Sequence, residues 1–251
     1  MRLILEVWRQ AGPTAEGRYE VHEVTDATPE LSLLELLDRL NHNLVEEGHD
    51  PVAFESDCRE GICGTCGVDF NGVPHGPENN APACGQRVRL FQDGQKVRVT
   101  PFRAKAYPVV RDLIVDRTGL DRIIQAGGTV AVDAGTAPDP DTMQLNHDDA
   151  ERALDFATCI GCGACVSACP NGAAYLFTGA KLSHLTLIPQ GRNERAKRAR
   201  SMVAQMEQEF GPCSQIGECA LACPADVPLE AVAAVNRERI RAGIKGKTKA
   251  N

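Results

Sequence analysis

Four cysteines in the first third of the chain have the spacing of an iron–sulfur site. They are Cys58, Cys63, Cys66 and Cys84, which gives C-x4-C-x2-C and a distant fourth cysteine. This is the plant-type [2Fe–2S] pattern. Glycines at 61, 64 and 67 let the loop wrap closely, so that backbone N–H groups can offset the charge of the thiolates. A zinc site is the alternative, but structural zinc usually uses two separate C-x2-C pairs.

Seven further cysteines form two runs in the second half. The first run is Cys159-x2-Cys162-x2-Cys165-x3-Cys169-Pro170, the bacterial ferredoxin pattern. The second is Cys213-x5-Cys219-x3-Cys223-Pro224, which is the same pattern with Ile216 in place of one cysteine. In two-cluster ferredoxins the last cysteine of each run binds the cluster of the other run. The two runs therefore predict two clusters that exchange ligands.

This exchange assigns every remaining cysteine. The predicted [4Fe–4S] ligands are Cys159, Cys162, Cys165 and Cys223, and the second site keeps Cys169, Cys213 and Cys219. Because Ile216 has no donor atom, the second site is predicted to hold [3Fe–4S]. The alternative is a complete cubane with an outside ligand such as water, Ser214 or Glu218. All eleven cysteines of the chain are used, with none left over.

The composition supports metal binding rather than disulfides. The N-terminal residues lack a secretory cleavage site, and no window reaches the roughly 18 apolar residues that span a bilayer. We therefore expect a reducing compartment, in which cysteines stay free or bind metal. The net charge of −7 gives no reason to expect a nucleic-acid partner.

The elements of the first hundred residues predict a compact α+β domain. Alternating patterns predict strands over Arg2–Gln10 and Arg18–Val24. Ser32 and Glu35 fit a capping box that opens a leucine-rich helix. Two more strands are expected over Gly85–Phe91 and Gln95–Thr100, joined by a turn at Asp93-Gly94. Cys84 would then lie just before a strand.

After Pro101 the pattern becomes helical, so we expect a domain of residues 1–106 followed by an all-α domain of residues 107–251. The predicted helices are Val109–Arg117, Leu120–Ala126, Asp148–Thr158, Asn193–Phe210 and Leu229–Ala242. In the fourth of these, Ala199, Met202, Val203, Met206 and Phe210 share one face. Residues 127–142 are rich in Gly, Pro, Asp and Thr and are expected to form an exposed loop.

The cysteine motifs resemble those of the iron–sulfur subunits of succinate dehydrogenase and fumarate reductase. The similar segments are CREGICGTCG at 58–67, CIGCGACVSACP at 159–170, CSQIGECALACP at 213–224 and the stretch from Val110 to Asp116. The resemblance implies a β-grasp ferredoxin domain followed by a helical ferredoxin-like domain. It also implies a flavoprotein partner with covalent FAD, which oxidises succinate to fumarate, and a membrane anchor that passes electrons to quinone.

Two positions depart from the family pattern. Well-known members place a Trp and a His of the quinone site where this chain has Ala174 and Ser214. In this respect the chain resembles the menaquinone-linked branch of Gram-positive bacteria and actinobacteria, whose anchor often carries haem or other redox centres. The resemblance places the chain at the cytoplasmic face of the cell membrane, held by the anchor.

No nucleophile–base constellation, phosphate loop or nucleotide fingerprint is visible, so no catalytic residue is expected on this chain. Iron–sulfur clusters move single electrons, and the leading interpretation is the electron-transfer subunit of succinate:quinone oxidoreductase. Fumarate reductase, which runs the reverse reaction, is the first alternative. The second is a different class, a soluble ferredoxin-like carrier or a heterodisulfide-reductase-type subunit, although such proteins usually keep both cubanes complete or carry extra cysteine motifs.

Overall fold

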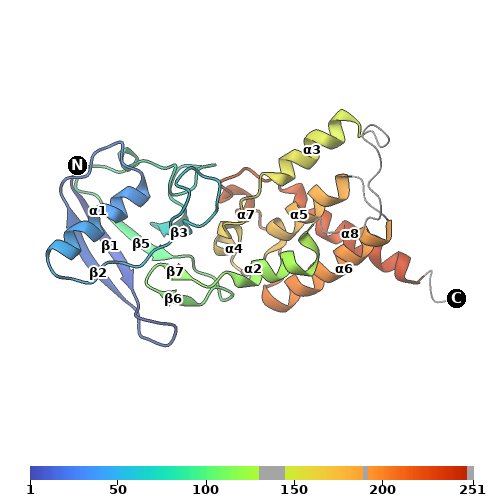
Figure 1. Cartoon of the computed structure of the whole chain (residues 1–251), viewed down its shortest axis with the longest axis horizontal. Coiled ribbons are helices and arrows are strands. Elements are labelled where there is room, and N and C mark those ends of the chain that lie inside the picture. The colour runs from blue at the N-terminus through green and yellow to red at the C-terminus, as the bar shows by residue number, and fades with distance from the viewer. Residues whose placement is uncertain (130–144, 189–191, 248–251) are drawn as a thin grey trace.

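The computed structural model describes residues 1–129, 145–188 and 192–247. Figure 1 shows two lobes along the longest axis: a sheet with one long helix at the N-terminal end, and a bundle of helices at the C-terminal end. Within the described ranges no helix combines the length and the apolar character that a membrane span requires.

The first lobe is a five-stranded mixed sheet in the order β2-β1-β5-β3-β4. The strands are β1 (Leu3–Arg9), β2 (Arg18–Val24), β3 (Val68–Phe70), β4 (Val73–Pro74) and β5 (Lys96–Pro101). Strand β1 pairs antiparallel with β2 and parallel with β5, while β3 pairs antiparallel with β5 and β4. Both predicted strands are confirmed, and the alternation predicted for the first is present in β1, since Leu3, Leu5 and Val7 are fully buried.

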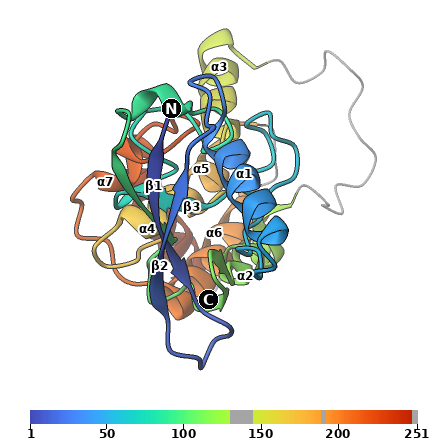
Figure 2. The ribbon, with the colours of Figure 1, turned by 90° about the vertical axis from the view of Figure 1, so that its left-hand side faces the viewer.

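Helix α1 (Leu33–Glu46) covers one face of this sheet, as Figures 1 and 2 show. The predicted capping box is present. The Ser32 hydroxyl accepts from the Glu35 N–H at 3.1 Å, and the Glu35 carboxylate accepts from the Ser32 N–H at 2.6 Å. The Ser32 N–H, followed by the Ser32 hydroxyl, lowers the pKa of the Glu35 carboxyl group. The leucines of α1 and the inward side chains of β1 share one hydrophobic core.

The predicted strand over Gly85–Phe91 is wrong, because this segment forms a short 3-10 turn at Val88–Leu90. Strand β5 already has β1 and β3 as neighbours, so no edge is left for a hairpin partner. The Asp93-Gly94 turn instead leads into β5, and the Asp93 carboxylate accepts from the Arg2 N–H at 2.7 Å. Cys84 is therefore held by a loop.

The predicted helix over Val109–Arg117 is also wrong. This segment forms a small hairpin of β6 (Val109–Arg111) and β7 (Ile114–Val115), so the second half is not helical throughout. The turn residue Asp112 has a φ of 46°. Its buried carboxylate accepts from the N–H groups of Gln10 and Ala53, both at 2.9 Å. Contacts distant in sequence thus override the local helical pattern.

The second lobe is built from helices. They are α2 (Thr118–Ile123), a π-turn (Ile124–Gly128), α3 (His147–Ala157), α4 (Ala164–Ala168), α5 (Tyr175–Leu187), α6 (Arg192–Glu209), α7 (Glu218–Leu221) and α8 (Glu230–Lys247). The helices predicted near α2, α3, α6 and α8 are confirmed, as is the buried face of α6. Most of the loop predicted at 127–142 lies outside the described residues.

Helix α5 was not predicted and lies at the centre of this lobe. It packs against α3, α6 and α8 and is buried on most sides, so its sequence lacks a polar stripe. Gly179 brings α5 directly against the backbone of Ala231 in α8, where a Cβ atom would clash.

Candidate iron–sulfur centres

The eleven cysteines are all free thiols and all lie among the described residues. Six of them have a pKa that is shifted in part by another cysteine, which shows that the thiols lie in groups rather than scattered through the fold. The three groups are Cys58, Cys63, Cys66 and Cys84; Cys159, Cys162, Cys165 and Cys223; and Cys169, Cys213 and Cys219.

Three cysteines of the first group, Cys58, Cys63 and Cys66, lie on the loop between α1 and β3, and Cys84 lies on the loop that follows β4. Three backbone N–H groups, those of Glu60, Ile62 and Cys63, donate to the Cys58 sulfur at 3.3–3.4 Å. These bonds lower the pKa of Cys58 to about 7, with the Glu60 N–H as the largest cause. The Thr65 N–H donates in the same way to the Cys63 sulfur at 3.4 Å. The loop thus presents an N–H shell to anionic sulfur.

The two remaining cysteines of this group are buried behind the loop. Burial raises the pKa of Cys66 to about 12, a rise that the Cys84 N–H partly opposes and the charge of the Cys84 thiol supports. A thiol in this position becomes a thiolate only when a cation replaces its proton. The group therefore joins a stabilised outer thiolate to buried thiols that a metal would ionise.

The second group lines a cavity closed by Leu176, Phe177 and Val227. Burial, followed by the charges of Cys159 and Cys223, raises the pKa of Cys162 to about 12. The Val227 N–H donates to the Cys223 sulfur at 3.5 Å. Four thiols that line one apolar cavity, three of them with a pKa raised by burial and by their neighbours' charges, have the chemistry of a shared metal site.

The third group lines a separate cavity among α5, α7 and α8, with Cys169 placed directly after α4. Burial and the charge of Cys169 raise the pKa of Cys219. The Gln215 N–H donates to the Cys213 sulfur at 3.3 Å. Ile216 lines the same cavity and is 54% exposed, and Ser214 and Glu218 line it as well. Three thiols and an aliphatic side chain thus share this cavity.

The donor arrangement fits polynuclear clusters better than single ions. In the part of the chain that the structure describes, no three His, Cys, Asp or Glu side chains converge closely enough to hold one metal ion. A zinc site needs four donors within about 2.0–2.3 Å of one point. In the second and third groups the thiols instead surround a cavity, as ligands of an iron–sulfur core would.

Comparisons with known proteins agree with this arrangement. Residues 4–122 match the family described as "2Fe-2S iron-sulfur cluster binding domain", and residues 158–227 match "4Fe-4S dicluster domain". The fumarate reductase iron-sulfur subunit of Escherichia coli O6:H1 is 30% identical over 213 residues, which are 80% of this chain and 77% of that protein.

The chain belongs to the family of succinate dehydrogenase and fumarate reductase iron–sulfur subunits. The succinate dehydrogenase iron-sulfur subunit of Bacillus subtilis is 28% identical over 84% of this chain and 82% of its own length. A solved structure, the Mycobacterium smegmatis Sdh1 complex in the apo form, contains a chain of the same fold. Its TM-score is 0.65 at 22% identity, covering 100% of this chain and 99% of that one.

In this iron–sulfur subunit one arginine joins the first cysteine loop to the second. The Arg117 guanidinium donates to the carbonyl of Gly64 at 2.8 Å, to that of Thr65 at 3.1 Å and to that of Cys162 at 2.6 Å. It also pairs with Glu55 at 3.1 Å. Sequence analysis missed Arg117, because its acceptors are backbone groups about 50 residues away, which leave no local signal.

Proposed function

We propose that this iron–sulfur subunit carries electrons in succinate dehydrogenase, from the FAD of a flavoprotein subunit to a membrane anchor and quinone. The observation that carries the proposal is the contiguity of the three thiol groups. Gly64 of the first loop lies against Ile160 and Cys162 of the second. The charge of Cys219 in the third group contributes to the raised pKa of Cys165 in the second.

The proposed ligands follow the cysteine pattern. Cys58, Cys63, Cys66 and Cys84 would hold [2Fe–2S]; Cys159, Cys162, Cys165 and Cys223 would hold [4Fe–4S]; Cys169, Cys213 and Cys219 would hold [3Fe–4S]. When bound, such clusters supply reversible one-electron transfer. The protein's own part is to ionise the thiols, to donate N–H groups to the sulfurs, and to exclude water with apolar side chains such as Phe177.

The first thiol group is proposed to face the flavoprotein. The outer loop that carries Cys58 is exposed at its tip, where Ile62 is 67% exposed, and an apolar side chain in this position suits a protein contact. We assign this domain to the β-grasp fold, with its boundary at residue 106. The chain would lie at the cytoplasmic face of the cell membrane, held by the anchor.

The third thiol group is proposed to face the anchor. Leu229 lines its cavity and is half exposed, and Leu221 stands on the adjoining helix α7, also exposed. Ala174 is completely buried at the start of α5, so a tryptophan there would require repacking. The Ser214 hydroxyl accepts from the Asn171 amide at 2.7 Å. We therefore propose that menaquinone is reached through the anchor, by way of its own haem or similar centre.

Fumarate reductase is the second candidate function. It is favoured by the relative in Escherichia coli that bears this name at 30% identity. The two activities are the same reaction in opposite directions, and they share every feature of this chain described above.

Purification from detergent-solubilised membranes tests the proposed function. We expect the chain to copurify with a subunit that carries covalent FAD, in a complex that reduces a menaquinone analogue when succinate is added. A complex that oxidises a reduced quinone with fumarate much faster would favour the second candidate. A chain recovered alone in the soluble fraction would overturn both.

A further inference from the structure

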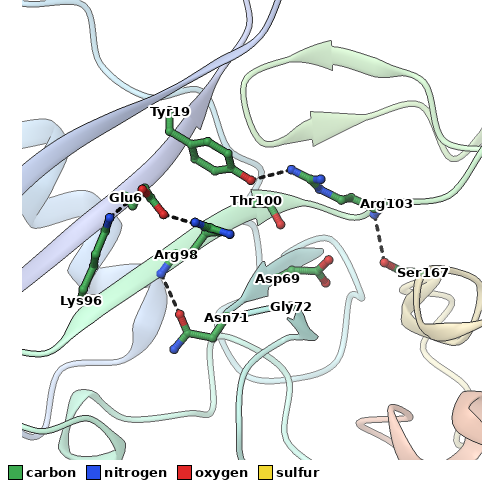
Figure 3. A pocket seen from close by; sticks show the side chains of 10 residues that line it. All are labelled: Glu6, Tyr19, Asp69, Asn71, Gly72, Lys96, Arg98, Thr100, Arg103 and Ser167. Atoms are coloured by element: carbon green, nitrogen blue, oxygen red, sulfur yellow. Dashed lines mark hydrogen bonds and ion pairs between the residues drawn. The ribbon is translucent and has the colours of Figure 1, made fainter.

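A polar pocket lies on the face of the first sheet opposite α1. Val97 and Val99 of β5 point into the core beneath α1, so the alternating Lys96, Arg98 and Thr100 point the other way. The pocket measures about 510 Å³, a size that suits small ligands. It is lined by residues of β1, β2, β3 and β5 and by Ser167 of α4, and by none of the cysteines (Figure 3).

On one side of the pocket the charged side chains already pair with one another. The Glu6 carboxylate accepts from the Lys96 ammonium at 2.7 Å and from the Arg98 guanidinium at 2.6 Å. These two bonds lower the pKa of Glu6. The Arg98 guanidinium also lies over the Tyr19 ring, 5.0 Å from its centroid. One carboxylate facing two cations leaves this side with an excess of positive charge.

The other side holds a carboxylate and a guanidinium that do not pair with each other. Asp69 is only 5% exposed, yet its carboxylate makes no hydrogen bond or ion pair with any described residue, and Oδ1 is inaccessible. Arg103 donates to the Tyr19 hydroxyl at 2.7 Å and lies over the Trp8 ring, but it has no carboxylate partner among the described residues. Figure 3 shows the Asp69 carboxylate pointing toward the part of the pocket that holds Arg103 and Ser167.

An unpaired buried carboxylate near an unpaired guanidinium calls for a group that satisfies both. Such a group must offer a hydrogen-bond donor to Asp69 and anionic oxygens to Arg103. A cation would be repelled by Lys96, Arg98 and Arg103. A fully deprotonated anion would place its oxygens against Asp69 with no proton between them.

We propose that this pocket binds a small oxyanion that carries its own hydroxyl donor, the chemistry of hydrogen phosphate and its monoesters. The anionic oxygens would lie at Arg103, and the P–OH group would donate to Asp69. The Thr100 hydroxyl and the Asn71 amide line the same pocket as further polar partners. Arg103 donates its backbone N–H to Ser167 of α4 at 3.0 Å, so the bound anion would lie where the sheet lobe meets the helical lobe.

Calorimetric titration of the full-length, cluster-loaded chain tests this site. At about pH 8 hydrogen phosphate still has a hydroxyl donor, whereas sulfate has the same charge and none. Because sulfate would leave the buried Asp69 acceptor without a donor, we expect phosphate to bind about tenfold or more tightly than sulfate. Equal affinities for the two anions, or no phosphate binding at millimolar concentrations, would overturn the proposal.

Three variants assign the effect to the pocket. Asp69→Asn offers a donor in place of the carboxylate, so sulfate should gain affinity and the preference for phosphate should disappear. Arg103→Gln should weaken both anions by about tenfold or more. Arg89→Gln removes the same charge from an exposed arginine outside the pocket and should leave both affinities unchanged. An Asp69→Asn chain that keeps the full preference, or an equal loss in Arg89→Gln, would refute the site, and the wild-type contrast stands as a test if a variant misfolds.

Discussion

Gly64 lies in direct contact with Cys162, across the boundary between the first and second cysteine loops. A Cβ atom on Gly64 would stand 2.9 Å from the Cys162 amide nitrogen and would collide with the carbonyl oxygen of Ile160. Gly64 also has a φ of +69°, which side chains rarely adopt. The two loops can approach this closely because one of them has no side chain at the contact.

We expect Gly64→Ala to separate the two loops. The positive φ costs about 1–2 kcal/mol, and the collision with the second loop adds about 1–3 kcal/mol. The melting temperature should fall, and magnetic coupling between the first two clusters should weaken in electron paramagnetic resonance spectra.

Gly72→Ala is the matched control for this contact. Gly72 has a φ of +81°, but a Cβ atom there would have no neighbour within 4 Å. Gly72→Ala should lose only the part of the stability that the positive φ costs, because no collision is added. The magnetic coupling between the clusters should stay unchanged. If the two variants behave alike, the contact between the loops has no importance of its own.

Arg117→Gln should destabilise the chain by about 3 kcal/mol, because a partly buried guanidinium that donates to three carbonyls is removed. Arg117→Lys should rescue little of this loss, since an ammonium lacks the planar fork. Chemical denaturation measures the free energy of unfolding. Arg122→Gln, which breaks an ion pair between Arg122 and Glu209 with Arg122 half exposed, should cost about 1 kcal/mol or less. A loss for Arg117→Gln as small as that of Arg122→Gln would contradict the bridging role.

Asp69 should make stability fall as pH rises through the weakly acidic range. Burial raises the pKa of Asp69 to about 7 from 3.8, so at pH values between these the folded chain holds a proton that the unfolded chain releases. From about pH 5.5 to 7.5 this lowers the free energy of unfolding by about 2 kcal/mol in phosphate-free buffer. Asp69→Asn should remove this slope and be the more stable chain at the alkaline end. Parallel pH profiles for the two chains would contradict the assignment.

Cys219→Ser should impair the terminal cluster and electron exit to quinone. Succinate oxidation with an artificial acceptor should survive better, because that acceptor takes electrons upstream. Ser214→Ala tests the alternative ligand in the same cavity, and it should leave the terminal cluster's spectrum unchanged. Equal loss of both activities in Cys219→Ser would argue against placing Cys219 at the terminal cluster, on the quinone side of the chain.

The amphipathic and capped elements were predictable from local patterns. The box of Ser32 and Glu35 and the apolar face of α6 each depend on residues within a few turns of one another. Helix α5 was missed because it is buried on most sides. Such a helix has no polar stripe, so its sequence lacks the alternation of apolar and polar faces that identifies a surface helix. The hairpin at 109–115 was mistaken for a helix because the acceptor role of Asp112 depends on Gln10 and Ala53, far away in the sequence.

The functional site likewise combines features that a local sequence pattern predicts with features that depend on the fold. The cysteine spacing is a local pattern, so it could be interpreted without a fold, and the ligand sets remain predictions on that basis. The connections between the loops through Arg117 and Gly64, and the pocket around Asp69, arise only when distant strands and helices meet. Backbone carbonyl acceptors are the same for every residue type, so a sequence cannot indicate them.

Iron analysis combined with electron paramagnetic resonance of the oxidised chain tests the row of three clusters most directly. The account predicts about nine iron atoms per chain, divided as two, four and three, and the spectrum of an oxidised [3Fe–4S] centre from the cavity beside Ile216. Zinc in place of iron, or a full second cubane with no [3Fe–4S] signal, would contradict it.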